Sequence, residues 1–262
     1  MFEVLKSRFI QGYRTGKYPV KEGANLPERF LGRPAIDQAK CRPFRETLCS
    51  MCPANALEVK EDQLILDMGR CTFCGKCAKV TDGIAFSKDY ALSAIKRENL
   101  FISAVDPLPE NIANDLFRKF CKRSLKIRQV SAGGCAACEL DFNVLNTLAW
   151  DMGRFGIQVV ASPRHADCIL VTGPVTENMR LALEKTRNAM PDPSFVILCG
   201  ACGISGGLYR ENPETHKGGE ALLKADLYIP GCPPHPAVIL EGLLYLMGRS
   251  TKVLQKLRNP AK

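Results

Sequence analysis

The sequence lacks several features that would define a protein's class at once. No apolar run approaches the roughly 20 residues that a transmembrane helix needs, and residues 1–6 do not begin a secretory signal. There are only three histidines and one tryptophan, and we find no nucleotide-binding glycine fingerprint and no catalytic-triad motif. We therefore expect no spanning segment and no nucleotide chemistry. We also expect a reducing, cytoplasmic location in which disulfides do not form.

Cysteine, by contrast, is abundant. Thirteen cysteines among 262 residues is a high number for a reducing compartment, where the usual reason to keep many thiols is the binding of metal ions or iron–sulfur clusters. The 46% hydrophobic and 24% charged fractions are those of an ordinary globular protein. The length is sufficient for two domains, each with its own core.

Positive charge is concentrated in the first half of the chain. Residues 1–128 hold 23 Lys and Arg against 15 Asp and Glu, which gives +8 of the net +9. No aromatic or helical recognition element for nucleic acid accompanies this charge, so we expect no nucleic-acid partner. An anionic membrane surface or an acidic protein partner explains the asymmetry more simply.

The first 37 residues are predicted to form a helix and then an extended strap. From Met1 to Thr15, apolar residues alternate with lysine and arginine in the pattern of a short amphipathic helix with a basic face. This pattern leaves open whether the apolar stripe lies on a bilayer or packs on the protein's own core or on a partner. Prolines at positions 19, 27 and 34 exclude a regular helix or central strand from residues 16–37.

A first cysteine group lies between residues 52 and 77. Cys71, Cys74 and Cys77 are spaced at intervals of three, and Cys52 is followed by proline. In bacterial ferredoxins, three cysteines at this spacing and a remote Cys-Pro bind one [4Fe–4S] cluster. The same set, Cys52, Cys71, Cys74 and Cys77, is therefore predicted here, with a zinc ribbon as the alternative.

A second ferredoxin cluster in this region is predicted to be lost. Thr81 stands where the fourth cysteine of the second run belongs, and only Cys41 and Cys49 remain as thiol ligands. We interpret Cys41 and Cys49 as buried or half-buried thiols.

A second cysteine group begins at Cys135 and Cys138. This pair alone fits a zinc half-site, a redox dithiol or an iron–sulfur half-site equally well. Cys202 and Cys232 each follow an apolar, strand-like run and lie among glycines or prolines. Their placement is typical of ligands at the ends of strands.

Strand and helix patterns alternate through the second half of the chain. Such alternation predicts a parallel sheet whose active centre lies beyond the carboxyl ends of the strands, where these cysteines fall. The expected strands are Ile127–Ala132, Ile157–Ala161, Cys168–Thr172, Phe195–Cys199 and Leu227–Pro230, and the expected helices are Leu140–Phe155, Thr176–Met190 and Pro236–Met247.

The motifs resemble two subunits that are normally separate proteins. Residues 1–100 resemble the ferredoxin-type subunit shared by respiratory complex I and membrane-bound hydrogenases such as formate hydrogenlyase. From about residue 126 the chain resembles the small subunit of a group 4 [NiFe] hydrogenase. The motifs are Tyr18-Pro19, Leu31–Pro34 and Gly69–Gly75 in the first part, and Ser162–Asp167, Val171–Thr176 and Pro230–Pro234 in the second.

This resemblance implies a fused chain with an α+β ferredoxin-like N-terminal domain followed by an α/β flavodoxin-like parallel-sheet domain. Between them we expect a linker that starts with Asp106-Pro107 and continues into a basic, helix-like stretch. The expected boundaries are 1–37 for the helix and strap, 38–103 for the ferredoxin-like domain, 104–126 for the linker, 127–250 for the α/β domain and 251–262 for a basic tail.

The resemblance also implies the second ligand set. Cys135, Cys138, Cys202 and Cys232 would hold a second [4Fe–4S] cluster, proximal to the catalytic site of a separate large subunit, while Cys199 would lie outside the set. The complex I homologue typically has two adjacent cysteines where this chain has Cys135-Ala-Ala-Cys138. This difference favours the hydrogenase.

The implied function is electron transfer between two [4Fe–4S] clusters in a membrane-associated hydrogenase-type complex, peripheral on the inner face of the cell membrane. Expected partners are a hydrogenase-type large catalytic subunit, membrane-arm subunits, and a further ferredoxin or formate-oxidising subunit. The alternative is the same role in a related complex without a nickel site, or in a quinone-reducing complex.

Two acidic residues follow Cys138. Glu139 and Asp141 stand at a predicted helix start, where carboxylates commonly cap the helix. The other interpretation is a proton relay toward the large subunit. The resembling hydrogenases have the order Asp-x-Glu, which is reversed here.

Overall fold

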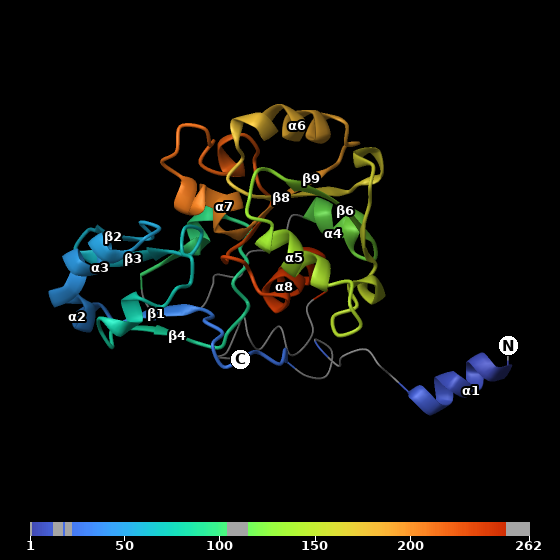
Figure 1. Cartoon of the computed structure of the whole chain (residues 1–262), viewed down its shortest axis with the longest axis horizontal. Coiled ribbons are helices and arrows are strands. Elements are labelled where there is room, and N and C mark those ends of the chain that lie inside the picture. Colours follow the sequence, from blue (N-terminus) through green and yellow to red (C-terminus); the bar gives the residue numbers. More distant parts are fainter. Residues whose placement is uncertain (1, 13–17, 19–22, 104–114, 250–262) are drawn as a thin grey trace.

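The computed structural model describes residues 2–12, 18, 23–103 and 115–249. Residues 23–103, the N-terminal lobe, lie beside residues 115–249, the C-terminal lobe, and helix α1 stands apart from both (Figure 1). Across these residues, we find no helix that combines the length and the apolar character required to cross a membrane.

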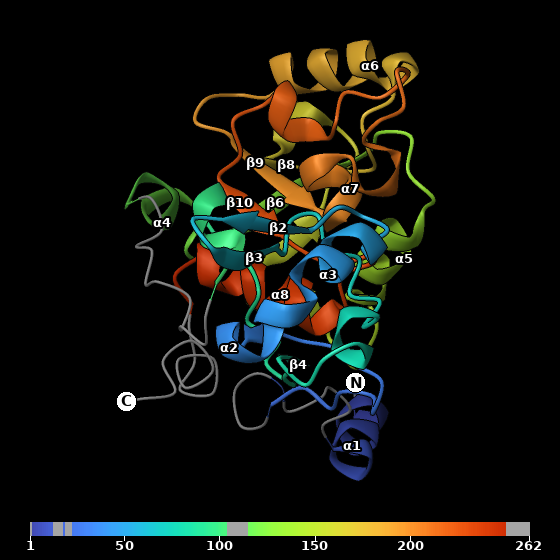
Figure 2. The same cartoon turned by 90° about the vertical axis from the view of Figure 1, so that its left-hand side faces the viewer.

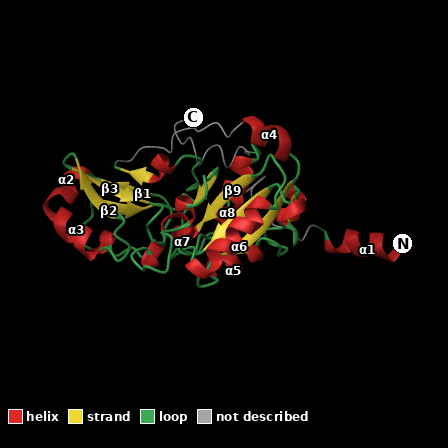
Figure 3. Ribbon diagram, turned by 90° about the horizontal axis from the view of Figure 1, so that it is seen from above, coloured by secondary structure: helices red, strands yellow, loops and turns green. Residues whose placement is uncertain are grey.

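The predicted N-terminal helix is present as α1, Phe2–Gln11. None of its residues is buried, and the apolar side chains Phe2 and Phe9 are 87% and 90% exposed. Figure 3 shows the helix projecting away from the two lobes. The apolar stripe therefore does not pack on the core formed by the described residues. Residues 13–15 of the predicted helix lie outside the described residues.

The N-terminal lobe contains two small antiparallel sheets, β2-β3-β5 and β1-β4. Figure 2 shows α2 and α3 with β2 and β3 in front of the C-terminal lobe. Pro34 begins β1 in the two-stranded sheet, a position where the missing N–H is tolerated. The elements are β1 Pro34–Ile36, α2 Gln38–Cys41, α3 Arg45–Met51, β2 Leu57–Lys60, β3 Gln63–Asp67, β4 Ile84–Phe86 and β5 Phe101–Ile102, with 3-10 turns at Arg42–Phe44, Cys77–Lys79 and Arg97–Leu100.

The C-terminal lobe is built on a five-stranded parallel sheet in the order β10-β9-β8-β6-β7. All five predicted strands are present, and β8 and β9 have the predicted bounds. Both are buried along their whole length, which explains their unbroken apolar runs. The strands are β6 Leu125–Ser131, β7 Ile157–Val159, β8 Cys168–Thr172, β9 Phe195–Cys199 and β10 Leu227–Ile229, and the helices are α4 Asp115–Cys121, α5 Ala137–Val144, α6 Glu177–Asn188, α7 Gly200–Ser205 and α8 Pro236–Leu246, with 3-10 turns at Met152–Phe155, Pro163–His165, Gly207–Tyr209 and Gly219–Ala221.

The prediction of one helix over Leu140–Phe155 was wrong. Helix α5 ends at Val144, where the Thr147 hydroxyl donates to the Val144 carbonyl oxygen at 2.7 Å and so competes with the helical pattern. Asp151 has a φ of +44°, which a helix cannot contain. The short helix α7 was not predicted, because Gly200 and Gly203 have low helix propensity.

The predicted joint between the two halves contains helix α4, as its basic, helix-like pattern indicated. Phe117 of this helix is buried and packs edge-on against Phe195 of β9, with ring centroids 4.4 Å apart. Strand β6 begins at Leu125, inside the predicted linker. Residues 104–114 and the predicted tail lie outside the described residues.

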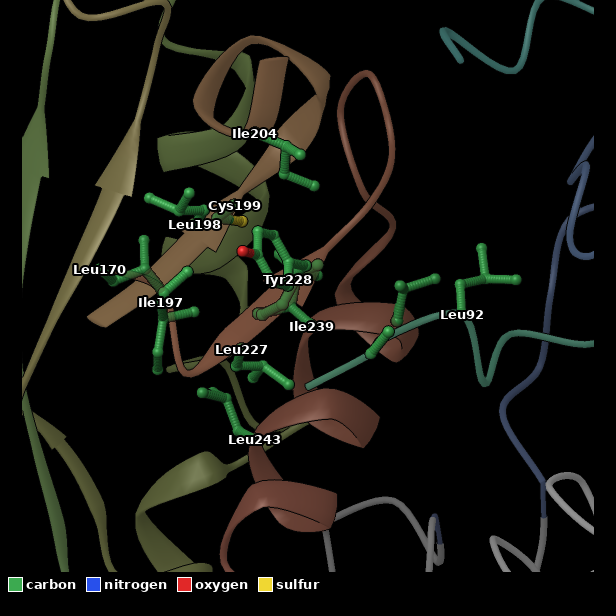
Figure 4. Close-up of a cluster of buried hydrophobic side chains, with 14 of the residues drawn as sticks. Leu92, Leu170, Ile197, Leu198, Cys199, Ile204, Leu227, Tyr228, Ile239 and Leu243 are labelled. Atoms are coloured by element: carbon green, nitrogen blue, oxygen red, sulfur yellow. The ribbon is translucent and has the colours of Figure 1, made fainter. Parts of the chain in front are cut away.

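The two lobes are joined by polar and apolar contacts. Arg97 of the N-terminal lobe binds buried Asp67 through two hydrogen bonds of 2.8 and 2.5 Å, and it also contacts Glu220 of the C-terminal lobe at 3.3 Å. The backbone of Ala94 pairs with Tyr228 of β10. Leu92 belongs to the same buried cluster as the sheet residues of the C-terminal lobe (Figure 4).

We predict that Arg97→Met lowers the free energy of unfolding by about 3 kcal/mol, because it leaves the buried Asp67 carboxylate without its main cationic partner. Anaerobic urea unfolding followed by circular dichroism measures this loss. Arg180→Met is the matched control, since Arg180 pairs with Glu177 and Glu184 on an exposed helix surface. Equal losses in the two variants would contradict the structural role of the Arg97 pair.

Candidate metal centres

The four cysteines of the first predicted group line one pocket. Cys52 ends helix α3, Cys71 follows the turn after β3, and Cys77 begins a short 3-10 turn, while Cys74 is exposed between them. The remaining wall of the pocket is largely apolar and includes Leu48, Met51, Ala56, Leu57, Leu66 and Phe86.

Backbone amides are directed at these sulfur atoms. The Ala56 N–H donates to Cys52 Sγ and the Phe73 N–H donates to Cys71 Sγ, each at 3.3 Å. Such bonds favour the thiolate, but burial outweighs them and raises the pKa of Cys71 to about 12 and that of Cys77 to about 11. The neighbouring cysteines add mutual repulsion. The thiolate forms of Cys71 and Cys77 are therefore favoured here only beside a positively charged group such as iron.

The second group comes from three separate segments at the carboxyl edge of the parallel sheet. Cys135 lies in the loop after β6, Cys138 in the first turn of α5, Cys202 in α7 and Cys232 in the loop after β10. These thiols lie close enough for the charge of one thiolate to raise the pKa of another. Burial raises the pKa of Cys202 to about 11, and the nearby thiols contribute to this increase.

Two glycines leave room beside these sulfur atoms. A β-carbon at Gly200 would lie 2.5 Å from Cys138 Sγ, and one at Gly207 would lie 2.8 Å from Cys202 Sγ. Both glycines also have positive φ values, +84° and +54°. The sequence analysis missed this role, although the glycines flanking Cys202 were a usable signal.

Each group of four cysteines suits a metal cluster that is bound through several of its iron atoms. Within the described ranges, no group of three or more His, Cys, Asp or Glu side chains is close enough to hold a single metal ion. A [4Fe–4S] cluster has four irons and takes one cysteine on each, so its ligands surround a volume instead of converging on one point. The cysteine-lined pocket and the space kept open by Gly200 and Gly207 are consistent with that geometry.

The two cysteine groups lie next to each other. Thr72 and Phe73, between two cysteines of the first group, line the same pocket as Cys232 of the second group, and Asp141 lines it too. In addition, the Ser205 hydroxyl of α7 donates to the Gly69 carbonyl oxygen at 3.0 Å. The loop that leads to Cys71 therefore rests directly on the helix that carries Cys202.

Cys41 and Cys49 lie in different surroundings. Cys41 is fully buried, and a β-carbon at Gly83 would lie 2.6 Å from its sulfur. Thr81, nearby, donates to the Lys40 carbonyl oxygen and accepts from the Gly83 N–H. Cys49 lies instead beside Cys52 and Glu58. The remaining cysteines, Cys121, Cys168 and Cys199, are buried.

Glu139 and Asp141 have different environments. Glu139 lies in the first turn of α5, but its carboxylate accepts a 2.6 Å hydrogen bond from the Thr172 hydroxyl at the end of β8, and no side-chain capping bond is made by the N-cap residue. Asp141 lines the pocket that also contains Cys232, and burial raises its pKa. The partner Thr172 was not predicted from the sequence.

In α/β proteins ligands bind at the carboxyl ends of the strands, and cysteine thiolates are the usual ligands of iron–sulfur clusters, so the position of these cysteines is consistent with an iron–sulfur protein. Residues 135–246 match the family described as NADH ubiquinone oxidoreductase, 20 Kd subunit. The chain belongs to this family, which binds iron–sulfur clusters. The matched residues all lie in the C-terminal lobe.

Three relatives illustrate the range of the family. The chain is 38% identical over 141 residues to a probable membrane-bound hydrogenase subunit, mbhJ, of Pyrococcus furiosus, covering 52% of this chain and 82% of that protein. It is 40% identical over 144 residues to formate hydrogenlyase subunit 7 of Escherichia coli, covering 55% of this chain and 56% of that protein. It is 39% identical over 119 residues to an NADH-quinone oxidoreductase subunit of Bacteroides thetaiotaomicron, covering 45% of this chain and 60% of that protein.

These relatives confirm the prediction of an oxidoreductase-complex subunit. The chain spans little more than half the length of formate hydrogenlyase subunit 7 and of the quinone oxidoreductase subunit.

We predict that Gly200→Ala removes the iron held by the second group, because the new methyl group would collide with Cys138 Sγ and strain a left-handed backbone position. Iron analysis of anaerobically purified protein should show a loss of about four iron atoms per chain. Gly23→Ala is the control, since its β-carbon would meet only the Tyr90 hydroxyl at 3.8 Å. Full iron content in Gly200→Ala would show that the close approach to Cys138 does not matter.

Proposed function

We propose that this chain transfers electrons between two [4Fe–4S] clusters within a membrane-associated, hydrogenase-type complex. The ligands of the first cluster are Cys52, Cys71, Cys74 and Cys77, and those of the second are Cys135, Cys138, Cys202 and Cys232. The observation that carries the proposal is the shared pocket in which Thr72 and Phe73 of the first loop meet Cys232 of the second group.

The two cysteine groups are arranged so that an electron can enter through an exposed cysteine of one group and leave through an exposed cysteine of the other. Each cluster, when bound, would supply a one-electron centre whose potential depends on hydrogen bonds, burial and net charge. Cys74 of the first group and Cys135 of the second are exposed, while Cys232 lines the pocket between the groups. An electron can therefore enter at one surface and leave at the other after a single step between neighbouring groups.

The surface around the second group supports a large catalytic subunit as its partner. Exposed apolar side chains surround the segments that carry Cys138 and Cys202, and such a surface is typical of a protein–protein interface. These side chains are Leu140, Val144, Leu148, Leu208 and Tyr209. At the other end, the exposed Cys74 fits a further ferredoxin or formate-oxidising subunit as electron donor.

The proposal includes the fusion of two subunit types. Residues 38–103 would be the ferredoxin-like domain, 104–126 the linker and 127–250 the proximal-cluster domain. The small antiparallel sheets around the first cysteine pocket support this division. Helix α1, with its exposed apolar side chains, supports a peripheral location on the inner face of the cell membrane, in contact with membrane-arm subunits.

A second candidate is the same role in a complex without a nickel site or in a quinone-reducing complex. The 39% identity to an NADH-quinone oxidoreductase subunit favours this candidate. The separation of Cys135 and Cys138 by two alanines instead favours the hydrogenase type.

We predict two clusters, or about eight iron atoms per chain, in anaerobically purified protein. Cys52→Ser should remove about four of them and leave the electron paramagnetic resonance signal of the second cluster unchanged. Cys121→Ser, at a buried thiol outside both groups, should keep all eight. A content near twelve would mean that Cys41 and Cys49 help to bind a third cluster, and zinc in place of iron would refute the relay.

We predict that Glu139→Gln lowers hydrogen turnover of the assembled complex by about a hundredfold or more, because the amide keeps the shape of the side chain but cannot transfer a proton. Iron content and subunit assembly should remain as in the wild type. Asp141→Asn is the matched variant. Wild-type turnover in both variants would exclude a proton relay through either carboxylate.

A further inference from the structure

A shallow pocket in the C-terminal lobe is lined by four cations and by no acidic residue. Lys122 and Arg123 follow α4, Arg154 belongs to the 3-10 turn Met152–Phe155, and Arg249 follows α8. Lys122, Arg123 and Arg154 are exposed. Three segments that are distant in the sequence thus bring positive charge to one place.

The arginines are held in position by the pocket itself. The guanidinium groups of Arg154 and Arg249 lie 4.7 and 5.6 Å from the centre of the Phe155 ring. Arg249 also donates to the Phe155 carbonyl oxygen. Burial lowers the pKa of Arg154, and nearby Asp151 only partly offsets this effect. Four cationic side chains around one pocket favour an anionic ligand.

The position of the pocket indicates a membrane as the source of that ligand. Arg154 donates to the carbonyl oxygen of Tyr18, whose ring is buried between Tyr90 and Trp150. Six residue steps connect Tyr18 to Gly12, the first described residue after α1, and they reach at most about 20 Å. The exposed apolar helix α1 is therefore tethered close to the pocket.

A further feature lies beside the basic surface. Phe120 of α4 is 57% exposed, beside exposed Lys119 and Lys122, and an exposed aromatic ring among cations is typical of proteins that bind membrane surfaces.

We propose that this pocket binds the phosphate groups of anionic phospholipids and, together with α1, orients the chain on a negatively charged membrane. The inference rests on the peripheral membrane location in the proposed function, and it adds the lipid class and the binding residues. An acidic partner protein would recognise the same charge, but the tethering of α1 beside the pocket favours the bilayer.

Flotation of the full-length, cluster-containing chain with lipid vesicles tests the proposal. We expect tighter binding to phosphatidylcholine vesicles that contain phosphatidylglycerol than to phosphatidylcholine alone. The double variant Lys122→Gln/Arg123→Gln should bind the anionic vesicles about thirtyfold more weakly, because each cation at such a surface contributes about fivefold. Its binding to neutral vesicles, through α1, should not change.

The matched control is Lys185→Gln/Arg187→Gln, which removes the same charge from α6, the helix at the top of Figures 1 and 2, whereas α1 lies at the bottom of both views. An equal loss in both double variants, or equal binding to neutral and anionic vesicles, would overturn the proposal. Binding of inorganic phosphate to the wild type but not to the Lys122→Gln/Arg123→Gln variant, together with no preference of the wild type for anionic vesicles, would assign the pocket to free phosphate and overturn the proposal. Iron content measured on the same samples keeps this outcome separate from the cluster proposal.

Discussion

The contact between the Gly69 loop and helix α7 determines how the two halves of the molecule work together. The Ser205 hydroxyl binds the Gly69 carbonyl oxygen, and a β-carbon at Gly69 would lie 2.9 Å from the Ile204 side chain, so only glycine permits this approach. Cys71 follows two residues after Gly69, and Cys202 lies within α7. Electron transfer requires neighbouring centres, and this contact brings the two cysteine groups to adjacent positions.

Backbone amide contacts distinguish Cys52 and Cys71 of the first group from the buried thiol of Cys168, although burial raises the pKa of Cys71 as well. Amide N–H groups point at Cys52 and Cys71, as they would at thiolates that carry part of a cluster's charge. Cys168, at the start of β8, is fully buried, and burial raises its pKa well above the ordinary value. A thiol in that environment stays protonated and acts as a small apolar side chain.

The molecule has exposed surfaces of two kinds, one apolar and one cationic. The apolar side chains near the second cysteine group fit a protein partner, whereas the cations between α4 and α8 fit a charged surface. Helix α1 belongs with the second kind, since none of its residues is buried. In the function proposed above, the first surface contacts a catalytic subunit and the second contacts a membrane.

The amino-acid sequence by itself indicated the first cysteine group, through its spacing, and the positions of the sheet-forming segments along the chain, whereas the second cysteine group followed from a family resemblance. Cysteine spacing and the apolar runs of β8 and β9 are local patterns, and local patterns can be recognised in a sequence without knowledge of the fold. Tertiary structure alone decided where α5 ends, that Gly200 and Gly203 form part of a helix, and that Thr172 binds Glu139. The last of these depends on atoms from two distant segments. Likewise, the sulfur of Cys138 lies close to where a Gly200 β-carbon would be, a contact between distant segments that no periodicity in the sequence reveals.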